Sequence, residues 1–317
     1  MKVYGWIGLL LLTISEYCLF RKIEPFTSWF YCFAWWSYIL LADNLLLKLR
    51  GGSLLTNRRH EFWGMLPISV FIWLLFESYN FIIQNWTYNV VPPQIWLRWP
   101  GYAVAFSTVL PGIFITSDIV QSLLDRACGC PVSGSEMLSS KPSAKPSALF
   151  MLFGLFLTFA PLVSPQYFFP AVWLGPIFLF DPLLEKVGIQ SLSLSISSGN
   201  RKRVWSLMLG GFICGIIWEF WNYWAGSKWS YSIPFGGQAK VFEMPVLGFC
   251  GFPPFALECW VLYHLIRGVS REMESSAARI SWWIALGIVS IIIFRGIDRH
   301  TIIRFAEQVL HSSSGGG

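Results

Sequence analysis

The stretch WLLFESYN (residues 73–80) decides the fold, because the chain carries a second version of it, IWEFWN, at residues 217–222. Both versions place a glutamate and an asparagine three positions apart inside a long apolar run. Residues three apart lie on the same face of a helix. We therefore expect two equivalent membrane helices, each with one polar Glu-x-x-Asn face.

Further matches flank these two segments and indicate an internal duplication. Trp36–Lys48 matches Trp173–Lys186, and the Trp86-Thr-Tyr88 segment matches Trp229-Ser-Tyr231. The separation ranges from 137 residues at the first pair to 143 at the second. A shift of four spans keeps both copies in the same orientation, which predicts a parallel repeat about an axis along the membrane normal.

The composition agrees with a membrane protein. The 317-residue chain is 55% hydrophobic and only 13% charged, whereas soluble domains are charged at about 25% of positions. Its apolar runs approach the roughly 20 residues that a bilayer core requires. The net charge of +6 comes from basic residues at the ends of apolar runs, so we expect no binding of nucleic acid.

We predict an all-α integral membrane protein with eight or nine transmembrane helices, built from two parallel four-helix repeats and one C-terminal helix. The predicted spans are 3–20, 27–47, 62–84, 102–124, 148–163, 167–184, 204–225, 243–266 and 281–297. The predicted domains are a first repeat at 1–126, a flexible linker at 127–147, a second repeat at 148–267, the ninth helix at 268–300 and a tail at 301–317, of which residues 312–317 are expected to be disordered.

The distribution of basic residues predicts the orientation. With the N-terminus inside, the inner segments hold 15 Lys and Arg and the outer segments hold 8. Basic residues favour the cytoplasmic side. We therefore expect an N-terminus inside, in a bacterial inner (cytoplasmic) membrane.

The carboxyl groups at Glu77 and Glu219 are the main candidates for chemistry. An ionisable group within a membrane helix costs about 2.5–3.5 kcal/mol on insertion scales, so it is expected to face the protein interior or a cavity. A buried, neutral carboxylic acid can donate a proton. Glu258 is a third candidate acid. It follows a stretch rich in proline and glycine, a composition that breaks helices. Broken helices are tolerated at membrane depth only beside protein or a cavity.

The polar and aromatic residues around these acids would contact a ligand. The predicted substrate-binding residues are Asn80, Trp86, Tyr88, Asn222, Trp229 and Tyr231. Together they suit an apolar pocket with a few polar groups. The alternative is structural, in which the Glu-x-x-Asn pairs join helices by hydrogen bonds and the Trp-x-Tyr segments anchor the chain at the membrane surface.

Asn222, the Trp229-Ser-Tyr231 segment and the following Met244-Pro245 resemble the lycopene cyclase domain of the small membrane-integral, bacterial and fungal type. That family also has duplicated units, each with a polar intramembrane residue, a Trp-x-aromatic loop and a proline at the start of the next helix. It cyclises the ends of linear carotenoids by protonating a double bond, without net redox chemistry.

The resemblance implies which residues would act, and it has one departure. The family's aspartate corresponds to Asn222 or Asn80, which implies that Glu219 and Glu77 are the proton donors here. This chain has Val246-Leu247-Gly248 where the family has a pair of acids.

Three hypotheses about function follow. The first is a protein that binds or modifies a membrane-embedded isoprenoid or lipid, with the Trp and Tyr of the two Trp-x-Tyr segments stabilising a carbocation by cation–π contact. The second is a transporter, and the third is an accessory structural subunit held by membrane protein partners. We expect no cofactor and no metal, because no motif for either is present.

Overall fold

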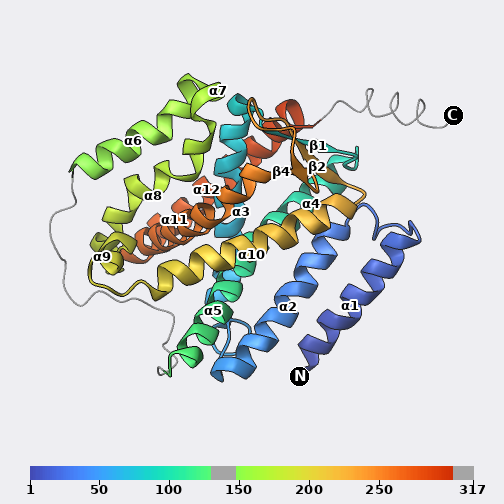
Figure 1. Cartoon of the computed structure of the whole chain (residues 1–317), viewed down its shortest axis with the longest axis horizontal. Helices are drawn as coiled ribbons and strands as arrows, with labels where there is room; N and C mark the ends of the chain where they lie inside the picture. Colours follow the sequence, from blue (N-terminus) through green and yellow to red (C-terminus); the bar gives the residue numbers. More distant parts are fainter. Residues whose placement is uncertain (130–147, 303–317) are drawn as a thin grey trace.

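The computed structural model describes residues 1–129 and 148–302. The element order is α1 (Val3–Phe20), α2 (Phe30–Arg50), α3 (Arg59–Ile83), β1 (Trp86–Asn89), α4 (Ile95–Phe106), α5 (Val109–Ala127), α6 (Ala148–Val163), α7 (Pro165–Phe168), η1 (Phe169–Trp173), α8 (Gly175–Phe180), η2 (Asp181–Val187), α9 (Leu192–Ser197), α10 (Lys202–Trp224), β2 (Lys228–Tyr231), β3 (Lys240–Val241), β4 (Met244–Pro245), η3 (Val246–Gly251), α11 (Phe252–Glu272) and α12 (Ser276–His300). Figure 1 shows a helical bundle with the β1–β2 ribbon at one end.

The first two helices of each predicted half pack closely through small residues. A Cβ on Gly8 of α1 would lie 2.9 Å from the Leu40 Cβ of α2. In the second half, a Cβ on Gly154 of α6 would overlap the backbone of Leu179 in α8. Small residues let membrane helices approach until their backbones touch, and both hairpins use this means of packing.

The two halves cross through their later helices. α5 packs along α10, and α11 packs against both α10 and α3. α12 lies against α3 on the outside of the bundle, where much of its surface is exposed (Figure 1). The buried core lies between α2, α3, α5, α10 and α11.

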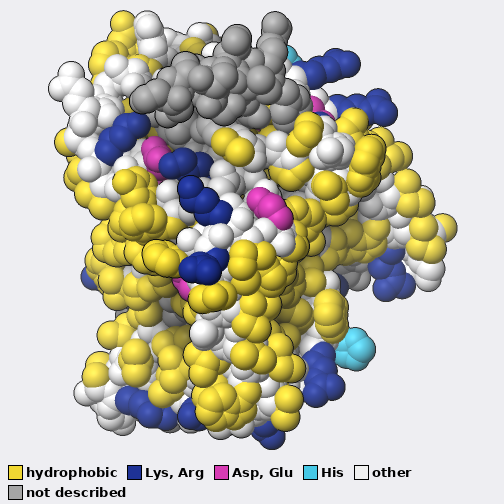
Figure 2. Space-filling view, turned by 90° about the vertical axis from the view of Figure 1, so that its right-hand side faces the viewer, with side chains coloured by type: hydrophobic (Ala, Val, Ile, Leu, Met, Phe, Trp, Pro, Cys, Tyr) yellow, Lys and Arg dark blue, Asp and Glu magenta, His cyan; other side chains and the backbone are white. Residues whose placement is uncertain are grey.

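The surface and helix lengths are compatible with an integral membrane protein. Among the described residues, seven helices are long and apolar enough to cross a membrane, or eight if the bent pair from Pro165 to Val187 is one span. α6 is apolar but shorter, with 16 residues. Figure 2 shows one face on which hydrophobic side chains cover most of the surface, with Lys and Arg at its lower rim. The mostly helical class is confirmed, while the exact number of spans stays a prediction.

Several predicted element boundaries are wrong. The predicted span 102–124 lies within one longer candidate span, Ile95–Ala127, which is broken at Ser107 and Thr108 into α4 and α5. The predicted span 243–266 becomes helical only from Val246, because Pro245 cannot donate a backbone hydrogen bond and Met244–Pro245 instead pairs with Lys240–Val241. The predicted span 167–184 is four short helical pieces.

The structure also contains strands, which the all-α prediction did not include, and buried residues directly after α12. Two short two-stranded sheets form, β1 with β2 and β3 with β4. Thr301 and Ile302, the first residues of the predicted tail, are buried beside β1, where the Tyr88 backbone N–H donates to the Thr301 carbonyl at 2.8 Å. The remainder of the tail and nearly all of the predicted linker lie outside the described residues.

Candidate functional site

The two Trp-x-Tyr segments meet in one antiparallel ribbon. The register pairs Trp86 with Tyr231, Thr87 with Ser230 and Tyr88 with Trp229. Each tryptophan therefore stands opposite the tyrosine of the other segment. Aromatic residues at alternate positions of a strand point to the same face, so four aromatic side chains lie on one side of the ribbon.

An asparagine in the last turn of α3 or α10 fixes the start of each strand. The Asn80 side chain donates to the Trp86 carbonyl at 2.8 Å and accepts from the backbone N–H of Asn85 at 2.8 Å. The Asn222 side chain donates to the Trp229 carbonyl and accepts from the Trp229 N–H, both at 2.9 Å. Each amide thus satisfies backbone groups at the turn from helix to strand.

Glu77 holds three aromatic side chains through a single oxygen. Its Oε1 accepts from the Tyr88 hydroxyl at 2.6 Å, from the Trp73 Nε1 at 2.9 Å and from the Trp86 Nε1 at 3.1 Å. The side chain is fully buried and its Oε2 has no hydrogen-bond partner. Glu77 therefore ties β1 to the middle of the bundle.

Glu219 makes a smaller version of the same arrangement. Its Oε1 accepts from the Tyr231 hydroxyl at 2.7 Å, and that hydroxyl accepts from the Trp229 Nε1 at 2.7 Å. Glu219 is also fully buried, and its Oε2 also has no partner. The Glu-x-x-Asn and Trp-x-Tyr residues of the first half thus make contacts that correspond to those of the second half.

The two tyrosines of the ribbon hold their protons tightly. Burial and the neighbouring Glu77 raise the pKa of Tyr88 well above its ordinary value. Burial and the neighbouring Glu219 likewise raise the pKa of Tyr231. Both phenols are therefore hydrogen-bond donors at any physiological pH.

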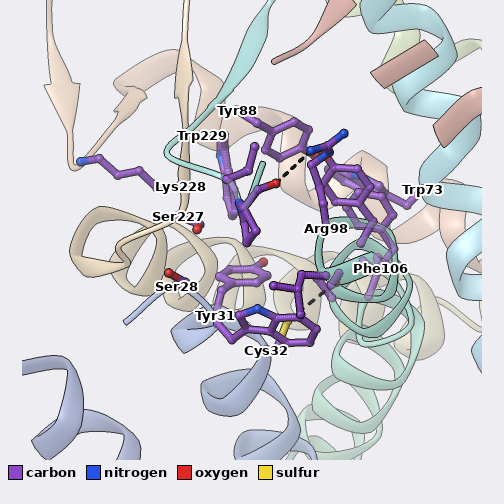
Figure 3. A pocket seen from close by; sticks show the side chains of 18 of the residues that line it. Ser28, Tyr31, Cys32, Trp73, Tyr88, Arg98, Phe106, Ser227, Lys228 and Trp229 are labelled. Atoms are coloured by element: carbon purple, nitrogen blue, oxygen red, sulfur yellow. Dashed lines mark hydrogen bonds between the residues drawn. The ribbon is translucent and has the colours of Figure 1, made fainter. Parts of the chain in front are cut away.

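A first cavity of about 90 Å³ lies beneath the ribbon on the side of the first half. Figure 3 shows Tyr31 and Cys32 of α2 on one side and Tyr88 and Trp229 of the ribbon on the other. Its remaining wall includes Trp73, Trp218 and residues of α4, which are apolar apart from the ion-paired Arg98. Half-buried Ser28, Ser227 and Lys228 form a polar edge.

A second cavity of about 50 Å³ adjoins the first. It shares Trp73, Tyr88, Trp218 and Trp229 with the first cavity, so these four side chains separate the two. Its other wall comes from Trp86 of β1 and from residues of the second half. The residues there are Trp86, Trp173, Tyr231, Met244, Gly248, Gly251, Phe252 and Phe255.

The predicted site residues fall into two groups. Trp86, Tyr88, Trp229 and Tyr231 line one or both cavities. The remaining predicted residues, Glu77, Glu219, Asn80, Asn222 and Glu258, are not among the lining residues of either cavity. The two glutamates and two asparagines lie behind the aromatic layer and position it through hydrogen bonds.

Glu258 lies apart from this arrangement in α11. Its side chain is fully buried, and neither carboxyl oxygen has a hydrogen-bond partner among the described residues. Burying an unpaired carboxylate costs far more than burying the neutral acid. Among the described residues, Glu258 thus has no hydrogen bond that links it to the two cavities.

Two features of the site were missed from the sequence. Trp73 and Trp218 lie between the cavities with their ring centroids 5.2 Å apart, and Trp73 stands one helical turn before Glu77, a spacing that indicates contact. A buried ion pair of Arg98 with Asp298 at 2.7 Å joins α4 to α12. No spacing rule relates residues 200 positions apart, so no sequence pattern predicts this ion pair.

Comparisons with known proteins add no assignment. No family model, curated protein or solved structure matches the chain. Within the described ranges 1–129 and 148–302, no group of three or more His, Cys, Asp or Glu side chains is placed to hold a metal ion.

Proposed function

We propose that the protein binds the apolar chain of a membrane-embedded isoprenoid or lipid in the two cavities beside the ribbon. The observation that supports this is the cavity lining, which is mostly aromatic and aliphatic apart from Arg98, which is paired with Asp298, and a polar edge at Ser28, Ser227 and Lys228. Ligand sites in proteins combine apolar walls with a few placed polar groups. An apolar chain would enter with its polar end at that edge.

The size of the cavities favours a narrow ligand segment. Volumes of about 90 and 50 Å³ are below the roughly 300 Å³ at which pockets take drug-sized molecules. They suit the end of an unbranched or prenyl chain, while the remainder of the ligand stays in the membrane. Tryptophan and tyrosine faces would contact the double bonds of such a chain.

The setting of the site belongs to the same proposal. The chain is placed in a bacterial inner membrane with its N-terminus in the cytoplasm, because 15 of the Lys and Arg would then be inside and 8 outside. The ribbon and the polar edge of the first cavity would then face the outer side.

Photolabelling tests the proposal. The purified protein in liposomes is exposed to a prenyl alcohol with a terminal diazirine, irradiated, and digested for peptide mass spectrometry. Labels are expected on the α2 segment that contains Cys32 and on the α4 segment that contains Tyr102, since both line the first cavity. Labelling confined to the exposed faces of α1 and α12 would contradict binding and favour the alternative of an accessory subunit.

A matched pair of variants sharpens this test. Ala105→Phe adds a ring to the lining of the first cavity, whereas Ala285→Phe adds the same ring to an exposed position of α12. We expect the first substitution to suppress labelling of Cys32 and Tyr102, and the second to leave it unchanged. Equal labelling in both variants would show that the cavity is not the binding site.

Acid catalysis on the bound chain is a second candidate, favoured by one observation. Tyr88 borders both cavities and donates to Glu77 at 2.6 Å, so a proton held by Glu77 could reach the cavity only through that hydroxyl. The phenol would give its proton to a double bond while receiving one from Glu77. The carbocation would then close a ring and lose a proton, with no net redox change.

Lipid extracts distinguish binding from catalysis. Extracts of the native host are compared with those of hosts that carry Tyr88→Phe or Glu77→Gln in place of the native chain. Loss of one cyclised product in both variants supports a relay through the hydroxyl. An unchanged product profile, together with intact photolabelling, would leave binding without catalysis.

A further inference from the structure

Three arginines from separate segments converge on one aspartate at the end of the bundle opposite the ribbon, here named the basic end. Arg50 ends α2, Arg58 directly precedes α3 and Arg203 lies in the first turn of α10. Their guanidinium nitrogens lie 3.5, 3.3 and 2.7 Å from the carboxylate of Asp118 in α5. Three segments thus place positive charge around a single negative group on a fourth.

Two of these arginines are buried and incompletely paired. The side chains of Arg50 and Arg203 are 9% and 7% exposed. The Arg50 Nη2 and the Arg203 Nε are buried and have no hydrogen-bond partner. The other polar contacts of these two side chains are to the neutral Ser122 and Gln121. One carboxylate therefore serves two buried guanidinium groups that both retain an unused donor.

Such an arrangement is complementary to a phosphate group. An unpaired buried charge is costly, and the planar guanidinium fork matches the oxygens of phosphate in a bidentate manner. The N-terminus of α10, which contains Arg203, adds a favourable dipole for an anion. The Asp118 carboxylate would orient the arginines around the phosphate site and would not occupy the site itself.

We propose that Arg50, Arg58 and Arg203 bind a phosphate group, and that the headgroup of an anionic membrane lipid supplies it. The neighbouring surface supports the lipid as the source. Leu123 follows Ser122 on α5, and Trp205 lies two residues after Arg203 on α10; both are more than half exposed. An acyl chain can lie on these side chains while its phosphate reaches the arginines, and tryptophan is common at this depth of a membrane. The site is separate from the cavities at the ribbon.

Thermal unfolding of the purified full-length protein in detergent tests the proposal. The protein is titrated with phosphatidylglycerol, with phosphatidylcholine or with inorganic phosphate. A ligand that binds only the folded state raises the unfolding temperature. Phosphatidylglycerol is expected to raise it well above the value in phosphatidylcholine. If inorganic phosphate gives the same rise and competes with the lipid, the site binds phosphate but its source is the free ion.

Variants locate the effect. Arg203→Lys keeps the charge but loses the fork, and Arg203→Gln loses both, so each is expected to weaken phosphatidylglycerol binding about tenfold or more. Arg279→Gln removes an exposed charge from the first turn of α12 and is expected to leave binding unchanged. An equal loss in all three variants, or no preference of the native protein for phosphatidylglycerol or phosphate over phosphatidylcholine, would overturn the proposal. The second comparison uses only the native protein, so it holds even where a variant does not fold.

Discussion

Replacing Glu77 by leucine is expected to destabilise the protein far more than the same change at Glu219. The Glu77 Oε1 accepts hydrogen bonds from Trp73, Trp86 and Tyr88. The Glu219 Oε1 accepts directly only from Tyr231 among the described residues. The two positions are both fully buried, so the number of donors left without an acceptor is the main difference between them.

The expected magnitude follows from that number. A buried donor left without a partner costs about 1–3 kcal/mol. Three donors then give about 3–9 kcal/mol for Glu77→Leu, and one donor gives about 1–3 kcal/mol for Glu219→Leu. Glu77→Gln keeps an acceptor oxygen, so its cost is expected to lie well below that of Glu77→Leu.

The assay is a reversible titration of the purified protein from mild detergent into SDS, followed by tryptophan fluorescence. The free energy of unfolding is compared among the native protein and the three variants. The reasoning is refuted if Glu219→Leu costs as much as Glu77→Leu, or if Glu77→Gln costs as much as Glu77→Leu.

Three further predictions concern stability. Glu258→Met is expected to raise the free energy of unfolding by about 1–3 kcal/mol, because it removes a fully buried carboxyl group without partners; a lower value in the same titration would mean that the acid has a partner in solution. Since burial raises the pKa of Tyr88, the unfolded state releases a proton above about pH 10 that the folded state retains. Stability should therefore fall as pH rises past that point, and fall less in Tyr88→Phe; identical pH profiles would contradict this. Gly154→Leu should separate α6 from α8, because no space exists for a Cβ there, whereas Gly64→Leu, with open space around it, should leave the unfolding midpoint unchanged; equal midpoints would contradict the close packing.

The sequence predicted the long helices because their signal is local. Span 3–20 coincides with α1 and span 148–163 coincides with α6, since hydropathy alone identifies such segments. The duplication also indicated which residues would correspond. Trp86 and Tyr88 were singled out for this reason, and both line a cavity.

The remaining features depend on contacts between distant segments. The pairing of Trp86 with Tyr231 joins residues far apart in the chain, and the period-two pattern of Trp-x-Tyr, which favours a strand, is too short to name its partner. The glutamates were predicted to contact a ligand, yet they lie behind the ring layer. Trp73 and Trp86 donate to Glu77, and Tyr231 donates to Glu219. Propensity and hydropathy do not indicate such competition between partners.

The central claim is that the two Trp-x-Tyr segments pair in the register that brings their four aromatic side chains into the lining of the two cavities. Thr87 and Ser230 stand opposite each other in that register, at a separation that a disulfide can bridge. The double variant Thr87→Cys/Ser230→Cys is made with Cys128, Cys130 and Cys250 replaced by serine and a protease site inserted between residues 130 and 147. After mild oxidation and cleavage, the two fragments are predicted to stay joined on a gel without reductant and to separate with it. Fragments that separate without reductant would contradict the pairing and, with it, the shared site.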